Sequence, residues 1–189
     1  MAAARSGKFC TVFPFDDTDI YKTIEGASFS LSLFPDKKLS LYIDTLIEKI
    51  KAAQEPDGYL YTARTINPAE PHHWAGKQRW EKERELSHEL YNSGHLYEAA
   101  VAHFQATGKR NLLDIAIKNA NLVCSVFGHD KQHVAPGHQV VEMGLVKLYR
   151  ITGKKEYLET AKYFIEERGH YTGYDASSKD QWKSGAYWQ

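Results

Sequence analysis

The segment from Arg84 to Lys109, RELSHELYNSGHLYEAAVAHFQATGK, decides the fold. Its apolar and small residues recur at alternating intervals of four and three positions, which is the period of one face of an α-helix. Gly108 is typical of a helix C-terminus, so we expect a helix that begins at His88 and ends at Gly108. The positions that form the predicted buried face are Leu90, Gly94, Tyr97, Val101 and Phe104.

The same periodicity predicts five further helices. Two precede the first segment, from about Asp16 to Phe34 and from Asp36 to Ala53, and three follow it within residues 110–128, 138–152 and 155–169. Their predicted buried faces are Ile20, Ile24, Ala27, Leu31 and Phe34; Leu39, Ile43, Leu46, Ile50 and Ala53; Leu112, Ile115, Leu122 and Val126; Val141, Leu145 and Leu148; and Tyr157, Ala161 and Phe164.

A repeat relates these helices to one another. Residues 106–116 (ATGKRNLLDIA) match residues 151–161 (ITGKKEYLETA) at a separation of 45 residues. Such periods are typical of stacked helical hairpins, which form open solenoids or close into a two-layered α/α toroid. We therefore expect an all-α fold of three hairpins, with residues 1–189 forming a single domain.

The composition excludes some functional classes. Lys and Arg number 24, as do Asp and Glu, and no basic block is interleaved with aromatic residues, which argues against a nucleic-acid binder. No apolar run approaches the roughly 20 residues that cross a bilayer, and the first residues lack the apolar stretch of a signal peptide. We expect a soluble protein that does not bind membranes, and the compartment stays open between cytoplasm and export.

Polar side chains stand before the first helix of each predicted hairpin. Asp17 and Asp19 precede the first pair, His88 and Glu89 the second, and His138 the third. Because equivalent ends of stacked hairpins lie on one rim, we expect these residues to converge there. The acidic pair suits helix capping, whereas histidine is a poor cap, which favours a binding role for the two histidines.

Several familiar site motifs are absent. A zincin site needs two histidines four residues apart, but His88 and His95 are seven apart. The sequence contains no glycine-rich phosphate loop and no Gly-x-Ser-x-Gly elbow. His129, His133 and His138 lie in a predicted loop without a nearby cysteine or carboxylate set, so we interpret them as a polar loop and not as metal ligands.

Residues 59–83 show no sustained period, and we interpret them as a long ordered loop, a kind of segment that is often functional. The adjacent pair His72 and His73 resembles metal ligands only superficially, because neighbouring side chains diverge. Surface polarity is the simpler explanation for this pair.

Five motifs occur in a fixed order: residues 15–25 (FDDTDIYKTIE), 53–60 (AQEPDGYL), 88–95 (HELYNSGH), 99–103 (AAVAH) and 136–138 (PGH). Together they resemble the catalytic domain of glycoside hydrolase family 127, the β-L-arabinofuranosidase family, from about Gly7 onward. The resemblance implies an (α/α)₆ barrel, of which this chain would supply about three of six hairpins. It also implies that His88 and His138 contact the sugar of an arabinose-containing glycan at the rim.

The resemblance further implies a retaining hydrolysis, in which a zinc-bound cysteine thiolate attacks the anomeric carbon and a glutamate serves as acid/base. In the family these groups come from later helices, and neither Cys10 nor Cys124 occupies a matching position, so we assign no catalytic residue and no zinc ligand in this chain. Cys124 falls in an apolar helical pattern and is expected in the core. We expect the front half of a barrel, or an abbreviated relative, inactive alone and prone to self-association through its open edges.

Alternatives from other classes remain open on the residues alone. The same rim could serve a non-catalytic carbohydrate-binding module, or another α/α-toroid sugar enzyme such as an epimerase or lyase-like protein, whose base would be a rim histidine or Glu89. Glu142 lies one helical turn after His138 and either orients it or is solvated. Asp17, Asp19, Glu89 and Glu142 are also candidates for the paired carboxylates of glycoside cleavage.

Overall fold

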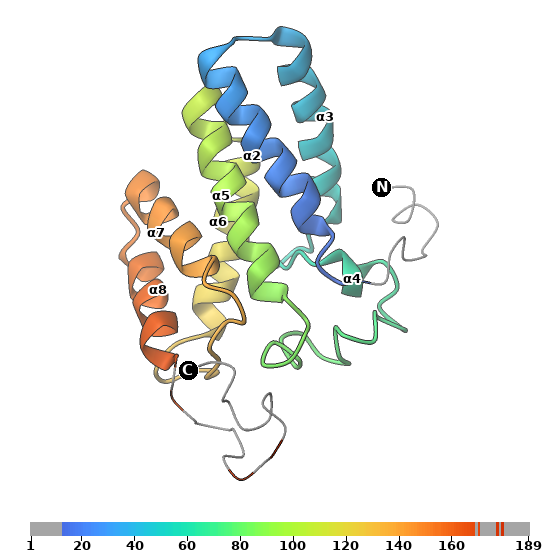
Figure 1. The fold of residues 1–189 in the computed structure, drawn as a ribbon, viewed down its shortest axis with the longest axis vertical. Helices are drawn as coiled ribbons and strands as arrows, with labels where there is room; N and C mark the ends of the chain where they lie inside the picture. Colours follow the sequence, from blue (N-terminus) through green and yellow to red (C-terminus); the bar gives the residue numbers. More distant parts are fainter. Residues whose placement is uncertain (1–12, 169, 171–176, 178, 180–189) are drawn as a thin grey trace.

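The computed structural model describes residues 13–168, 170, 177 and 179. Within that part of the chain the fold consists of helices without strands, which confirms the all-α prediction (Figure 1). None of these helices is long and apolar enough to cross a bilayer. The helices are α2 (Asp17–Leu33), α3 (Lys37–Ala53), the short α4 (Thr62–Thr65), α5 (Glu89–Thr107), α6 (Asn111–Val126), α7 (Val141–Thr152) and α8 (Lys155–Glu167).

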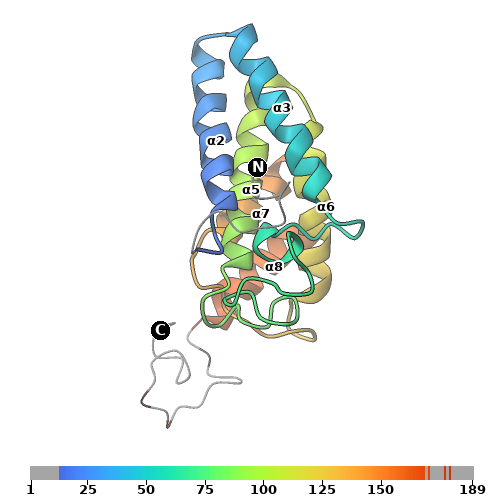
Figure 2. The same ribbon diagram turned by 90° about the vertical axis from the view of Figure 1, so that its right-hand side faces the viewer.

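The long helices form the three expected hairpins, α2–α3, α5–α6 and α7–α8, and these stack in two layers. In the first layer α5 packs between α2 and α7, and in the second layer α6 contacts both α3 and α8 (Figures 1 and 2). The N-terminal ends of α2, α5 and α7 all point toward the lower end of Figure 1, and the hairpin turns lie at the opposite end. The predicted rim therefore exists as a geometric feature.

The sequence repeat has a structural counterpart in the turns. Gly108 and Gly153 end α5 and α7 in the left-handed conformation, with φ of 71° and 73°, which favours glycine. The preceding threonines bond alike: Thr107 Oγ1 donates to the carbonyl of His103 and Thr152 Oγ1 to that of Leu148. The turn that opens α3 differs, because Asp36 accepts from the amides of Lys38 and Leu39, at 2.8 and 3.1 Å.

Two glycines allow α5 and α7 to approach closely. A Cβ atom added to Gly94 would lie 2.6 Å from the amide nitrogen of Val141, and one added to Gly144 would lie 2.7 Å from Cβ of Tyr97. The backbone at the start of α7 thus rests directly on α5. This contact sets the position of the loop that carries His138.

Some sequence predictions about burial were wrong. Phe34, expected on the buried face, is 73% exposed, and in α3 the most buried positions are Ile43, Ile47 and Ile50. The predicted loop of residues 59–83 includes the short helix α4. His72 is 6% exposed and its ring stacks on that of His73 at 4.4 Å, so the side chains do not diverge and His72 is not a surface residue.

Candidate functional site

Aromatic rings and imidazoles from three elements meet at the N-terminal ends of α5 and α7. The ring centroids of His88 and His138 are 5.2 Å apart, although the residues are separated by 50 positions. Tyr91 lies 5.6 Å from His88 and 4.8 Å from His138, and Phe15 lies 4.9 Å from His88. We call His88, Tyr91, His95 and His138 the rim cluster. The predicted convergence of the two histidines is therefore present.

The backbone holds His88 in an unusual conformation. It precedes α5 at φ 60° and ψ 26°, in the left-handed region, and its side chain makes no capping bond. Its Nδ1 lies 2.6 Å from the carbonyl oxygen of Leu86. Because a carbonyl only accepts, this contact places the proton on Nδ1, and the neutral ring then offers Nε2 as an acceptor.

The histidines of the rim cluster favour the neutral form. Burial lowers the pKa of His88. Burial also lowers the pKa of His138, and the charges of His88, Arg168 and Lys22 act in the same direction. For His95, burial, Lys22 and His138 lower the pKa to about 4. A neutral imidazole has one donor and one acceptor, which matches a sugar hydroxyl.

Three residues of this region were missed by the sequence analysis. Tyr91 and His95 follow His88 by three and seven positions, a helical spacing that could have revealed them, and in the structure Tyr91 and His95 lie one turn apart on α5. The rings of Tyr91 and His95 are 4.6 Å apart. Lys22 of α2 donates a 2.7 Å hydrogen bond to the Tyr91 hydroxyl, a contact between helices that sequence spacing does not encode.

Glu89 does not face the rim, although it directly follows His88. It is 1% exposed and accepts hydrogen bonds from the Tyr59 hydroxyl at 2.5 Å and from the Trp80 amide at 3.0 Å, and its Oε2 lies 3.0 Å from Ser87 Oγ. Burial raises the pKa of its carboxyl. Glu89 thus organises the interior beneath His88.

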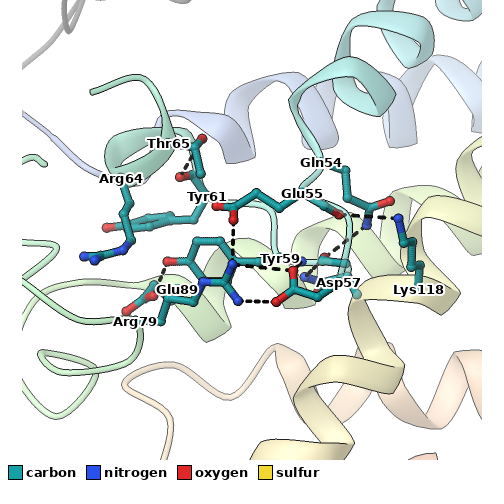
Figure 3. A network of polar contacts seen from close by, with 12 residues as sticks. Gln54, Glu55, Asp57, Tyr59, Tyr61, Arg64, Thr65, Arg79, Glu89 and Lys118 are labelled. Atoms are coloured by element: carbon teal, nitrogen blue, oxygen red, sulfur yellow. Dashed lines mark hydrogen bonds and ion pairs between the residues drawn. The ribbon is translucent and has the colours of Figure 1, made fainter. Parts of the chain in front are cut away.

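A second polar network secures Tyr59 from the other side (Figure 3). The Arg79 guanidinium lies 4.2 Å from the centroid of the Tyr59 ring and pairs with both Glu55 and Asp57, at 2.5 Å in the case of Glu55. Hydrogen bonding to Arg79 lowers the pKa of Asp57. The loop before α5 is therefore tied to the turn after α3.

The remaining acidic candidates have other partners. Asp17 accepts from the amide and hydroxyl of Thr62, at 2.8 and 2.5 Å, so it joins α2 to α4, and burial raises its pKa. Asp19 has an exposed side chain, and its carbonyl accepts from Thr23 Oγ1. Glu142 is 4% exposed with the Arg168 guanidinium 3.8 Å away, which rules out the solvated alternative; burial raises its pKa.

The described residues do not provide a zinc site. Across residues 13–168, 170, 177 and 179, no group of three His, Cys, Asp or Glu side chains could hold a metal ion. Cys124 is buried as expected, and its Sγ faces the carbonyl of Glu156 in the second layer, 3.8 Å away. Cys10 lies outside the described residues. We therefore derive no chemical step through zinc.

The three helical hairpins, stacked in two layers, have the arrangement of part of an α/α toroid. The chain belongs to the β-L-arabinofuranosidase family of glycoside hydrolases: the model of the GH127 catalytic domain matches residues 2–185. This confirms the family inferred from the five motifs.

Individual relatives agree with this assignment. The chain is 40% identical over 157 residues to a non-reducing end β-L-arabinofuranosidase of Bifidobacterium longum subsp. longum, covering 82% of this chain and 23% of that protein. A GH127 β-arabinofuranosidase structure matches with a TM-score of 0.85 and 53% identity, over 94% of this chain and 30% of that one. A GH127 β-L-arabinofuranosidase from Geobacillus stearothermophilus T6 matches with a TM-score of 0.76 and 43% identity, over 84% and 24%. The chain thus spans about a quarter of the length of these relatives.

Proposed function

We propose that this chain contributes the sugar-contacting edge of a β-L-arabinofuranosidase site, in which His88 and His138 bind an arabinofuranose unit of a glycan. The observation that carries the proposal is the 5.2 Å approach of their rings at the ends of two different hairpins. Family membership supplies the substrate class.

The chemistry of the rim cluster suits this role. The neutral His88 ring presents Nε2 as an acceptor for a sugar hydroxyl, and the rings of Tyr91 and Phe15 offer apolar faces beside it. Neutral imidazoles also avoid burying an unpaired charge against an uncharged sugar. We assign no step of glycoside hydrolysis to the described residues, and the zinc-dependent thiolate chemistry implied by the resemblance is proposed to come from elsewhere in a complete site.

Binding of L-arabinose, followed through the imidazole NMR signals of the chain, tests this function. We expect His88→Asn and His138→Asn each to weaken binding by about tenfold, the effect of losing a hydrogen bond worth roughly 1.4 kcal/mol. The control is His129→Gln, because the His129 side chain is 71% exposed and pairs with Glu166 at 3.7 Å. Equal affinity in all three variants would refute the assignment of the site.

A second measurement separates binding from catalysis. With zinc added, we expect the chain to bind arabinose without releasing it from a β-L-arabinofuranoside. Release that depends on zinc would show that this chain alone completes the reaction, contrary to our proposal. Retained binding by the two histidine variants would instead move the sugar site away from the rim cluster.

A further inference from the structure

Beneath the turn that carries His88, three buried side chains form a continuous polar chain. Glu83, Ser87 and Glu89 are at most 2% exposed. Ser87 Oγ lies 3.0 Å from Oε2 of Glu83 and 3.0 Å from Oε2 of Glu89. A hydroxyl has one proton to donate, so only one of these contacts is satisfied by serine, and the other requires a proton on a carboxyl oxygen.

The backbone indicates which carboxyl holds that proton. Glu83 Oε2 accepts from the amides of Glu89 and Leu90, at 2.8 and 3.2 Å, in the first turn of α5. The unpaired amides and positive dipole end of a helix favour an anion there. A covalently bound proton would weaken Oε2 as an acceptor for these amides, whereas a carboxylate oxygen can accept them together with the Ser87 hydroxyl, so we assign the charge to Glu83.

Glu89 has bonding partners that suit the protonated form. Its Oε1 accepts from the Tyr59 hydroxyl and from the Trp80 amide, which lies 3.0 Å from both carboxyl oxygens. Oε2 is then able to donate to Ser87 Oγ. The proton chain runs from Glu89 through Ser87 to Glu83, with every donor matched to an acceptor.

The charged surroundings agree with one shared proton. Burial raises the pKa of both carboxyls, and two negative charges this close would repel each other, so the pair retains a proton above the ordinary glutamate range. Burial also raises the pKa of the Tyr59 and Tyr61 hydroxyls, so both remain neutral donors. The opposing cation is Arg64, whose charge lowers the pKa of Glu89 and which is itself engaged by the carbonyls of Gly76 and Lys77.

We propose that Glu83 and Glu89 share one proton through Ser87, and that ionised Glu83 thereby caps α5 and holds His88 in its left-handed turn. Both glutamates are positioning residues, since they act on His88 and not on a ligand. The inference rests on the proposed function in one respect: the position of His88 matters for sugar binding only if His88 contacts the sugar. Its geometry is independent of any sugar.

Two isosteric variants of the intact 189-residue chain test the proposal, because it predicts different effects for the two glutamates. Glu89→Gln supplies an amide donor where we place the proton, so we expect unchanged nuclear Overhauser contacts between His88 and the rings of Phe15 and His138. Glu83→Gln removes the anion that caps α5, and we expect those contacts to weaken or vanish. Equal effects of the two substitutions would overturn the assignment.

A carboxyl titration measures the protonation of the two glutamates directly, which a purely structural role for them would leave at ordinary values. With ¹³C-labelled glutamate side chains, we expect one carboxyl of the pair to remain protonated at about pH 6, above the ordinary glutamate range. That signal should disappear in Glu89→Gln. Two carboxylates already ionised at that pH would refute proton sharing, and this holds even if Glu83→Gln does not fold.

The pH dependence of stability follows from the same proton. Between the ordinary glutamate pKa and the raised one, the folded chain binds more protons than the unfolded chain, so the folding equilibrium constant falls by up to about tenfold per pH unit as the pH rises. Glu89→Gln should lose this slope. Because none of these assays contains a sugar, failure here leaves the arabinose proposal intact, and failure of arabinose binding leaves the proton proposal intact.

Discussion

At the scale of single residues, the site depends on two backbone conformations that side chains rarely adopt. Among the described residues other than glycine, only Trp80 and His88 have positive φ, of 66° and 60°. Both flank the buried carboxyl of Glu89: the Trp80 amide donates to it, and His88 precedes it in the chain. The left-handed conformation costs such residues roughly 1 kcal/mol or more, which the interior bonds offset.

Paired substitutions at His88 separate backbone strain from binding. Asparagine tolerates the left-handed region, so we expect His88→Asn to change the free energy of unfolding by less than about 0.5 kcal/mol while it weakens arabinose binding about tenfold. A β-branched residue does not tolerate that region, and His88→Val should destabilise the chain by at least about 1 kcal/mol. Urea denaturation measures both effects. Identical stabilities would mean that the turn relaxes freely.

The sequence predicted two of the three histidines of the rim cluster, His88 and His138, but misjudged the position of Glu89. His88 and His138 could be placed together because each stands before the first helix of a hairpin, a relation that repeats with the hairpins. Glu89 was grouped with His88 as a rim residue, but its partners Tyr59 and Trp80 come from a segment without periodicity. Which way a side chain turns at a helix start depends on such contacts.

At the scale of helices, the position of the site depends on the close contact between α5 and α7. We expect Gly94→Ala to destabilise the chain by about 1–2 kcal/mol, because its methyl group would meet the Val141 amide at 2.6 Å and overpacking outweighs the gain in helix propensity. It should also separate His138 from His88 and weaken arabinose binding.

The matched control is another glycine inside a helix. A Cβ atom at Gly26 of α2 meets nothing within 4 Å, so Gly26→Ala should stabilise the chain by roughly 0.5–1 kcal/mol through helix propensity alone. Thermal unfolding compares the two variants. If both substitutions stabilise the chain, α7 is free to move off α5 and does not fix the rim.

The helices themselves were predictable because their apolar period is strong and their ends carry chemical signals. The α5 pattern and the repeated Thr-Gly-Lys turns identified the hairpins, and Asp36 caps α3 as its position suggested. The short helix α4 and the buried Tyr59, Tyr61 and His72 were missed because they lie in residues 59–83 and depend on long-range contacts. Local periodicity contains no information about those contacts.

At the scale of the whole molecule, one layer exposes apolar side chains beside charged ones. Phe29 of α2 is 54% exposed and borders a recess of about 360 Å³ that Lys147 and Ile151 of α7 also line, and Met143 is 54% exposed one turn before Lys147. Expected self-association through open edges would bury this face.

The combined substitution of Phe29 and Met143 by Gln should weaken self-association about tenfold or more in light scattering. Ile165→Gln, at a 62% exposed position in the second layer, should not, and a monomer at all concentrations would contradict the expectation.

The chain should also lose stability in acid through the histidines of the rim cluster, because burial lowers their pKa values in the folded state. For His95, the folded pKa of about 4 lies below the ordinary value of 6.5, so between these values the unfolded chain binds more protons than the folded chain. Stability therefore falls as the pH drops through this window.

We expect His95→Asn to reduce proton uptake on unfolding by up to about one proton at pH 5, measured as a shallower dependence of the urea midpoint on pH. The His129→Gln variant should keep the original dependence of the urea midpoint on pH. The shared carboxyl proton lowers stability as the pH rises, which is the opposite direction, so Glu89→Gln should keep the loss of stability in acid that His95 causes. An unchanged slope in His95→Asn would show that this imidazole is already solvated in the folded chain.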